Sequence, residues 1–125
     1  MINFLWVFLG GGMGSLCRYG IALRMSGLQT DFPHPTFWAN LISCFILGIL
    51  MALSLKSNMP THLKLLFMTG FCGGFSTFST FTGEFFSLLQ NGNFTVALSY
   101  IFTSLIICLI SLTLGFYLSN MLIAK

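Results

Sequence analysis

Long apolar stretches separated by short polar segments make up most of this chain. The four stretches cover residues 2–23, 37–55, 63–89 and 94–123. Each of them can supply the roughly 20 residues that a helix needs to cross a bilayer. Because the connections between them are short, the pattern predicts an all-α integral membrane protein with four transmembrane helices in a single domain, residues 1–125.

The third stretch contains a polar segment, residues 69–84, which reads TGFCGGFSTFSTFTGE. A helix in hydrocarbon gains little from so many glycine and hydroxyl residues. Non-helical backbone at membrane depth persists only where protein or water satisfies its polar groups. The segment therefore predicts a broken third helix, with two half-helices meeting around residues 73–77 beside a site or pathway. Gly70 and Gly74 also fit the alternative of a small-residue face for helix packing.

A break of this kind creates two chemically different helix ends. The first half-helix ends in unpaired carbonyls and the second begins with unpaired N–H groups, so the ends carry opposite partial charges. Carbonyl oxygens at mid-bilayer can hold a hard cation such as sodium. Phe75, Phe78 and Phe81 recur every three residues and are expected to share a face. Aromatic rings have a positive edge that can favour a small anion, although such a stripe is ordinarily lipid-facing or part of a core.

Polar side chains in the second and fourth stretches allow two interpretations each. Asn40 is the only amide of its stretch and lies one turn from Thr36 on the same face. It can form an interhelical hydrogen bond or present a donor to an anion. Ser104 and Ser111 lie nearly on one helix face with Cys108 between them. They can form a polar track, or each hydroxyl can bond the carbonyl one turn back.

The first stretch has glycine or serine at positions 10, 11, 12, 14 and 15. Only part of a GxGxxG fingerprint is met, and no β-α-β context surrounds it, so a nucleotide site is rejected. The spacing instead predicts a smooth helix face for close packing. Arg18 follows this face near the end of the stretch, where a cation must snorkel, pair or face water. It is either an anchor at the mouth of a pathway or part of the pathway.

Composition and charge exclude several classes of protein. Hydrophobic residues make up 56% of the chain, charged residues 6%, and the mean hydropathy is +0.94, far from the values of a soluble domain. The formal charge of +3 comes from too few cations for a nucleic-acid surface. Lys56, Lys64 and Lys125 are expected on one side of the membrane against Arg24 and Arg18 on the other. This weak bias predicts insertion in both orientations.

The cysteines and histidines suggest no redox or metal motif. The four cysteines, Cys17, Cys44, Cys72 and Cys108, fall one in each stretch, too far apart for a CxxC pair or a zinc spacing. We expect them to be small apolar packing residues. His34 and His62 are expected in solvated loops beside prolines.

Three motifs together resemble the Fluc/CrcB family of small fluoride channels. They are GGGMGSLCRY at residues 10–19, PTFWAN at 35–40 and GFCGGFSTFSTF at 70–81. The resemblance covers nearly the whole chain. It implies a dual-topology antiparallel homodimer with two fluoride pathways in the bacterial inner membrane, through which cytoplasmic fluoride leaves passively.

The same resemblance implies roles for individual residues. Phe78 and Phe81 would turn their ring edges toward fluoride, with Asn40 as the amide donor beside them. The carbonyls of Gly73 and Ser76 would hold a structural sodium ion at the dimer centre, two from each subunit. The remaining polar positions implied are Ser79, Thr80 and Ser104 along a track, and Thr36, Arg18 and Glu84 at further polar sites of the pattern. Two positions depart from the family: Ser76 stands where threonine is usual, and Cys108 where a hydroxyl residue is frequent.

No enzyme chemistry is predicted, because neither of the two carboxylates is paired with a histidine at a recognisable spacing. The expected partners are fluoride, lipid and a second copy of the chain, with no nucleic acid and no other protein. Two other classes stay open. A proton-coupled small multidrug exporter would need a carboxylate inside the bundle, for which Glu84 is the candidate. A non-conducting assembly subunit would need only small-residue packing faces.

Overall fold

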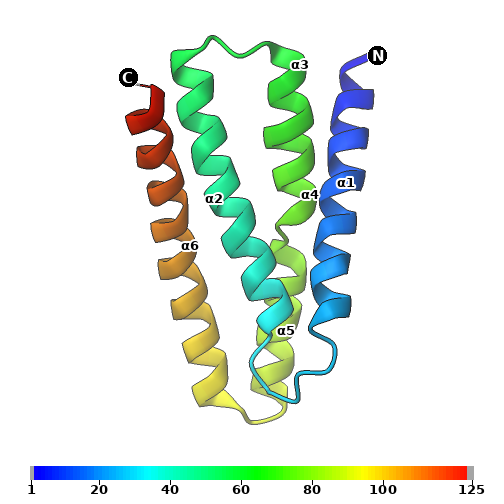
Figure 1. The fold of residues 1–125 in the computed structure, drawn as a ribbon. Coiled ribbons are helices and arrows are strands. Elements are labelled where there is room, and N and C mark those ends of the chain that lie inside the picture. The colour runs from blue at the N-terminus through cyan, green and yellow to red at the C-terminus, as the bar shows by residue number, and fades with distance from the viewer. Residues whose placement is uncertain (1, 124–125) are drawn as a thin grey trace.

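The computed structural model describes residues 2–123, and all the regular structure in that range is helical (Figure 1). The predicted all-α class is thereby confirmed. Lys125, one of the charges expected to flank the membrane, lies outside the described residues. The elements are α1 (Ile2–Arg24), α2 (His34–Lys56), α3 (Thr61–Leu63), η1 (Lys64–Cys72), α4 (Gly73–Phe75), α5 (Phe78–Gln90) and α6 (Phe94–Ile123).

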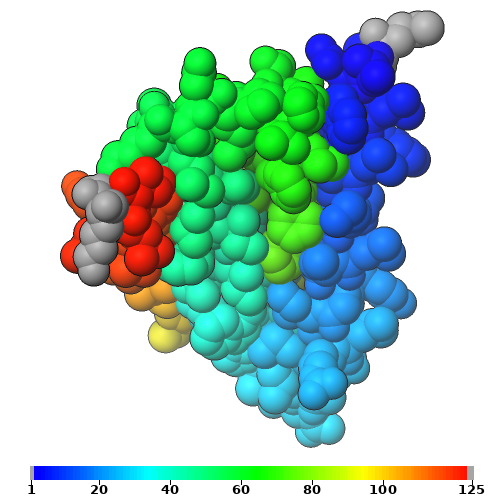
Figure 2. Space-filling view, turned by 45° about the horizontal axis from the view of Figure 1, so that its top comes forward, coloured from blue at the N-terminus to red at the C-terminus, as the bar shows by residue number. Residues whose placement is uncertain are grey.

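The helical segments run alternately up and down, with α2 and the α3-to-α5 succession between α6 and α1 (Figure 1). The start of α1, the end of α6 and the connection at residues 57–60 lie at one end of the bundle. The connections at residues 25–33 and 91–93 lie at the other end. Figure 2 brings the first end forward and shows the end of α6 on one side and α1 on the opposite side, with the green surface of α2 and α3 between them.

Two helix starts differ from the sequence prediction. Helix α2 begins at His34, three residues before the predicted apolar stretch, and Pro35 occupies its first turn. Proline is tolerated there because the first N–H groups of a helix have no partner within the helix. His62 lies in α3, which follows Pro60. The expectation that His34 and His62 lie in loops is therefore wrong.

A tight turn joins α5 to α6. Gly92 adopts a positive φ of 78°, a conformation that costs glycine little because it lacks a Cβ. The Asn93 N–H donates to the Leu88 carbonyl at 2.9 Å, and the Gly92 N–H donates to the Leu89 carbonyl at 3.1 Å. These are the two bonds of a Schellman motif. They terminate α5 cleanly and send the chain back along it.

Helix α1 packs directly on the backbone of η1 and α4. A Cβ added at Gly10 would lie 1.9 Å from the Leu66 carbonyl oxygen, and one at Gly14 would lie 2.1 Å from that of Phe71. From the other side, a Cβ at Gly74 would lie 2.3 Å from the Gly11 oxygen. The predicted small-residue packing face of the first helix is confirmed. The facing segment η1 is a nine-residue π-helix, a form that is rare and usually much shorter.

Helices α2 and α6 form a second close pair. A Cβ at Gly48 would lie 2.1 Å from the Leu112 oxygen, and one at Gly115 would lie 2.2 Å from the Phe45 oxygen. The Ser111 hydroxyl donates to the Leu41 carbonyl of α2 at 2.9 Å. This serine bonds a neighbouring helix rather than the preceding turn of its own. The two helices are thus held backbone to backbone.

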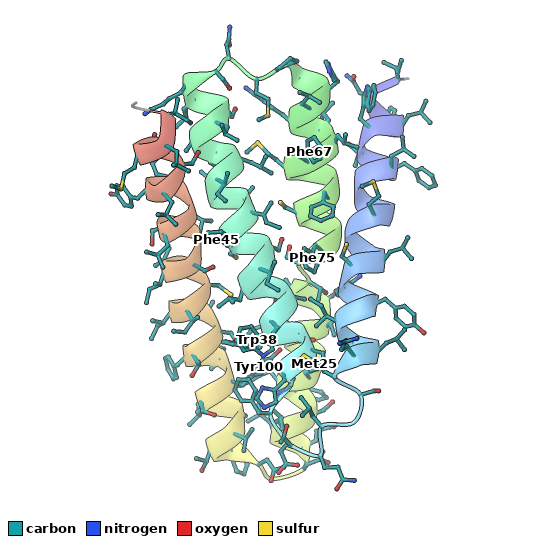
Figure 3. All side chains as sticks on the ribbon, in the orientation of Figure 1. Met25, Trp38, Phe45, Phe67, Phe75 and Tyr100 are labelled. Atoms are coloured by element: carbon teal, nitrogen blue, oxygen red, sulfur yellow. The ribbon has the colours of Figure 1, made fainter. Side chains whose placement is uncertain are left out.

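The outer surface of the bundle is apolar. Its exposed large side chains include Phe4, Phe8, Leu16, Leu55 and Leu122, and Figure 3 shows such side chains projecting along the outside of the helices. A soluble monomer rarely exposes so much contiguous apolar surface. Among the described residues, α2 and α6 are the helices long and apolar enough to cross a membrane by length and composition.

Candidate functional site

The helical path between α4 and α5 is interrupted at two residues. Ser76 has φ −74° and ψ 159°, and Thr77 has φ −152° and ψ 119°, so both are extended. The Cys72 carbonyl, one turn before the interruption, accepts hydrogen bonds from the Ser76 N–H, the Ser76 hydroxyl and the Ser43 hydroxyl, each at 2.9 Å. Three donors therefore satisfy this carbonyl, whereas the carbonyls of α4 follow it.

Thr77 caps the start of α5. Its Oγ1 accepts the Thr80 N–H at 3.2 Å and donates to Thr80 Oγ1 at 3.0 Å. The Ser79 hydroxyl lies 3.3 Å from the same oxygen. A threonine side chain at this position replaces a missing partner of the first helical N–H groups. The result is a cluster of three hydroxyls on the outside of the bundle, at the positive end of α5.

Asn40, on α2, spans the interruption with its amide. Its Oδ1 accepts the Thr77 N–H at 2.8 Å, and its Nδ2 lies 3.4 Å from the Thr77 carbonyl oxygen as donor. In a continuous helix the Thr77 N–H would donate to the Gly73 carbonyl. Asn40 thus replaces a backbone partner, and an amide nitrogen carries two hydrogens, so a second N–H is available to another acceptor.

A cavity of about 220 Å³ opens beside this amide, and we call it the Asn40 cavity. The hydroxyl of Ser104 is buried in its wall and has no hydrogen-bond partner among residues 2–123. Buried polar groups are nearly always paired, so this hydroxyl indicates a place for a polar ligand. The residues lining the Asn40 cavity are Asn40, Cys44, Ser76, Thr77, Phe78, Phe81, Ser104, Leu105 and Cys108.

Two phenylalanines border the Asn40 cavity. The rings of Phe78 and Phe81 lie 5.9 Å apart between centroids at an interplanar angle of 30°. Phe81 is 6% exposed and contacts the Tyr100 ring at 4.8 Å, whereas Phe78 is 76% exposed. One ring is therefore fixed in the core, and the other projects from the surface of a single copy of the chain.

Phe75 does not share their face, so that part of the sequence prediction is wrong. It is buried against α1 and lines a different cavity, which contains Cys17. The extended residues between α4 and α5 change the direction of the chain, and the three-residue spacing no longer places side chains on one face. Figure 3 shows Phe75 near the interruption and Tyr100 farther toward the end with the 25–33 connection.

Glu84 lies in the next turns of α5 and is held by two hydroxyls. Its Oε1 accepts from Thr36 and its Oε2 from Tyr100, each at 2.8 Å. Thr36 and Tyr100 are buried. Charge-assisted bonds of this kind are stronger than neutral ones. The three side chains connect α2, α5 and α6 at this level of the bundle.

A second cavity of about 350 Å³ contains most of the remaining predicted polar residues. Arg18 and Glu84 both line it, together with Thr36 and Thr80. The guanidinium supplies a positive charge at the end of the bundle where α1 ends. The full lining is Ser15, Arg18, Tyr19, Ala22, Pro35, Thr36, Thr80 and Glu84.

Of the Gly73 and Ser76 carbonyls predicted to hold sodium, that of Gly73 meets one requirement for a hard-cation site. Because the Thr77 N–H donates to Asn40, the Gly73 oxygen loses the donor that a regular helix would provide. Gly73 is also exposed. A Cβ added to it would meet no atom outside its own helix within 4 Å. Carbonyl oxygen is a preferred ligand of hard cations. The free Gly73 carbonyl is therefore a ligand of the type that a sodium ion takes.

The structure thus gathers the predicted residues into two cavities on either side of α5, with Ser79 and Gly73 on the surface. Sequence reasoning missed Thr77 and Tyr100. The TFST run at residues 77–80 is a capping pattern that could have identified Thr77. No sequence pattern identifies Tyr100, because its contact with Glu84 depends on how α5 and α6 are aligned.

Comparison with known proteins gives one family and several relatives. The family described as CrcB-like protein, Camphor Resistance (CrcB), matches residues 5–116. Three similar proteins bear the name fluoride-specific ion channel FluC. That of Azobacteroides pseudotrichonymphae is 43% identical and the match covers 91% of this chain and 93% of the relative. The relative from Escherichia coli K12 is 44% identical, and the match covers 90% of this chain and 89% of the relative. The relative from Bacteroides fragilis strain YCH46 is 36% identical, and the match covers 96% of this chain and 98% of the relative.

Proposed function

This chain belongs to the CrcB family, and from that membership we propose that it is a fluoride-selective ion channel whose path includes the Asn40 cavity. It is a membrane channel and not an enzyme. The relatives that carry the channel name match it over nearly their whole length. Their bacterial origin supports a multi-pass location in the bacterial inner membrane.

One observation carries the assignment of the path: the unpaired buried hydroxyl of Ser104 shares a cavity with the Asn40 amide and two phenylalanine rings. Fluoride is small and strongly hydrated. A selective path must replace its water with donors and still release it. An amide N–H, a hydroxyl and ring edges are neutral donors, which stabilise an anion without trapping it as a fixed cation would.

The second cavity supplies the continuation of the path. Thr80 and Thr36 offer hydroxyls, and Arg18 attracts anions to the mouth. Glu84 accepts both of its hydrogen bonds from hydroxyls. The Glu84 carboxylate orients the hydroxyls of Thr36 and Tyr100. Fluoride can accept from these hydroxyls only by replacing the carboxylate. The track of Ser79, Thr80 and Ser104 lies around the start of α5.

A second copy of the chain in the opposite orientation completes the proposed channel. The Phe78 ring is 76% exposed, and the Thr77, Ser79 and Thr80 hydroxyl cluster faces outward. Polar side chains and backbone groups without hydrogen-bond partners are unfavourable in contact with lipid. A protein surface that packs against this face would therefore be favoured. An antiparallel dimer about a two-fold axis buries both copies of this face and forms two equivalent paths.

Sodium is the proposed structural cation of this dimer. The carbonyls of Gly73 and Ser76 from each copy would hold it near the two-fold axis. The ion would supply positive charge that offsets the repulsion between the carbonyl ends of the two interrupted helices. Removing sodium is expected to weaken dimerisation.

The exporter alternative predicts a different transport reaction. Glu84 is the carboxylate it would use, but both oxygens of that carboxylate are held by Thr36 and Tyr100. A carboxylate that exchanges protons for a cationic substrate has to be free to bind the substrate. The hydrogen bonds favour a positioning role for Glu84.

The test is anion efflux from liposomes that contain the purified protein. Vesicles are loaded with potassium fluoride or potassium chloride, and valinomycin releases the counter-charge. Rapid loss of fluoride with little loss of chloride supports the channel. Cation-for-proton exchange supports the exporter, and no flux of any ion supports the assembly subunit.

A further inference from the structure

Two cysteines that are distant in the sequence meet in the wall of the Asn40 cavity. Cys44 lies on α2 and Cys108 on α6, and both line the cavity and are half-buried free thiols. The two helices run in the same direction (Figure 1), and each cysteine lies one turn before a residue of the Gly48–Leu112 contact, so both lie at the same level of the α2–α6 pair.

The packing of α2 on α6 holds Cys44 and Cys108 in these positions. One turn along α2 from Cys44, Gly48 touches the Leu112 backbone, and Gly115 touches the Phe45 backbone. The Ser111 hydroxyl binds the Leu41 carbonyl on the same pair of helices. A disulfide requires the two backbones to be close. Here the backbones of the two helices already touch one turn away from the cysteines.

We propose that Cys44 and Cys108 form a reversible oxidation site in the wall of the ion path, where hydrogen peroxide converts the two thiols into a disulfide that lowers fluoride flux. This inference rests on the proposed function. Hydrogen peroxide is neutral and only slightly larger than water. A cavity of about 220 Å³ that is open to the ion path admits it.

The reaction has two steps. In the first, the sulfur of one cysteine attacks an oxygen of the peroxide, the O–O bond breaks, and a sulfenic acid and one water form. In the second, the other thiol attacks this sulfur, the S–O bond breaks, and a second water leaves as the disulfide forms. The two thiols lose two electrons and two protons in total, and the peroxide is reduced to two waters. A dithiol reductant reverses the reaction by exchange.

The disulfide changes the wall that the ion passes. Two weak S–H donors disappear from a surface that also presents the Asn40 amide and the Ser104 hydroxyl. The sulfurs become acceptors without hydrogens, which face an anion unfavourably. A covalent link between α2 and α6 also stops either side chain from moving aside. Both effects lower the rate of fluoride passage.

The experiment uses the full chain in potassium fluoride liposomes, measured reduced, after hydrogen peroxide, and after a dithiol reductant. Digestion and mass spectrometry identify the disulfide and its partners. We expect a Cys44–Cys108 bond, a severalfold fall in fluoride efflux, and recovery on reduction. Cys17→Ser, at an exposed site on α1, is expected to respond to peroxide like the unchanged chain. Cys44→Ser and Cys108→Ser are expected to give the same efflux before and after peroxide, whatever their starting rate.

Three results would overturn the inference: a disulfide that involves Cys72 or Cys17 instead, no disulfide at all, or a Cys44–Cys108 bond that leaves efflux unchanged. Failure of the proposed function is visible separately. In that case the reduced protein releases no fluoride, whereas mass spectrometry still reports whether the pair becomes oxidised.

Discussion

Asn40 and Thr77 form a two-point contact across the interruption of the third helical segment, with Oδ1 accepting the Thr77 N–H at 2.8 Å and Nδ2 directed at the Thr77 carbonyl at 3.4 Å. One side chain thus stabilises the extended backbone and also lines the proposed ion path. Oδ1 and one N–H of Nδ2 hold Thr77, and the second N–H of Nδ2 is the donor to the path. The two roles are separable by substitution.

Asn40→Asp retains the acceptor for the Thr77 N–H, but replaces the amide donor with a second carboxylate oxygen. We expect a folded protein with fluoride efflux close to the background of empty liposomes. Asn40→Leu removes the acceptor too, and leaving a buried N–H unpaired costs about 1–3 kcal/mol. We therefore expect a larger fall in melting temperature for Asn40→Leu than for Asn40→Asp, which loses only the longer Nδ2 bond, measured by circular dichroism in detergent. Normal fluoride efflux through the Asn40→Asp protein would contradict the donor role.

Phe78 and Phe81 are expected to be equally important for flux but unequal for stability. Replacing either by isoleucine removes a ring edge, and fluoride efflux should fall strongly in both variants. Phe81→Ile also loses its contact with the Tyr100 ring, a kind of pair worth about 1 kcal/mol, whereas Phe78 is exposed in a single copy. Phe102→Ile, at an exposed position of α6, is the control and should conduct normally. Unchanged efflux in both path variants would refute the ring-edge role.

Gly14 and Gly12 lie in the same helix but differ in their surroundings. A Cβ at Gly14 would lie 2.1 Å from the Phe71 oxygen, and one at Gly12 meets nothing within 4 Å. Gly14→Ala must push α1 away from α4, and overpacking of this kind costs about 1–3 kcal/mol or more. Gly12→Ala should be neutral or slightly stabilising, because alanine favours a helix. Thermal unfolding of the two proteins gives the comparison, and equal melting temperatures would contradict the close α1 packing.

Glu84 and Tyr100 are expected to be coupled in stability. Tyr100→Phe removes one donor to the carboxylate, and Glu84→Gln turns an amide N–H₂ toward a hydroxyl. Each change should destabilise by about 1–3 kcal/mol. The double variant should be more stable than the sum of the two single effects predicts, because both remove the same bond. Four unfolding curves complete the cycle, and strict additivity would mean that the 2.8 Å contact contributes nothing.

The orientation of the chain in the membrane is expected to be mixed. Lys56 and Lys64 lie toward one end of the bundle, and Arg24 lies toward the other. So small a bias lets both insertions occur at similar frequency. Labelling of a single introduced cysteine in the 57–60 connection with an impermeant reagent, in a chain without its own cysteines, should modify about half of the molecules. Complete labelling, or none, would show a single orientation.

Features that depend on local sequence were predictable. Asn40 stands out as an amide in an apolar stretch, and the glycine and hydroxyl residues at 69–84 point to an irregular segment. The glycines of α1 have the spacing of a packing face, and their contacts with Leu66 and Phe71 confirm it. In each case the signal comes from residues a few positions apart.

Features that depend on the alignment of separate helices were not predictable. The meeting of Cys44 and Cys108 in one cavity wall depends on the α2–α6 packing, and the Tyr100–Glu84 bond depends on that of α5 on α6. The expected common face of Phe75 and Phe78 failed for a related reason, since two extended residues intervene. Helical periodicity applies only within an uninterrupted helix.

The π-helical winding of Lys64–Cys72 has a consequence for how such a chain can vary in length. This winding accommodates more residues per turn than an α-helix does, and each residue lost or gained in a helix rotates the downstream residues by about 100°. A one-residue deletion here can be absorbed by a return to α-winding, whereas a two-residue deletion would still turn Gly74 away from Gly11, which it contacts. The same deletion at residues 57–60 would only shorten a connection. Natural descendants of this chain should therefore tolerate length changes before Thr61 and the loss of one residue within Lys64–Cys72, whereas larger changes within that segment should be eliminated by selection.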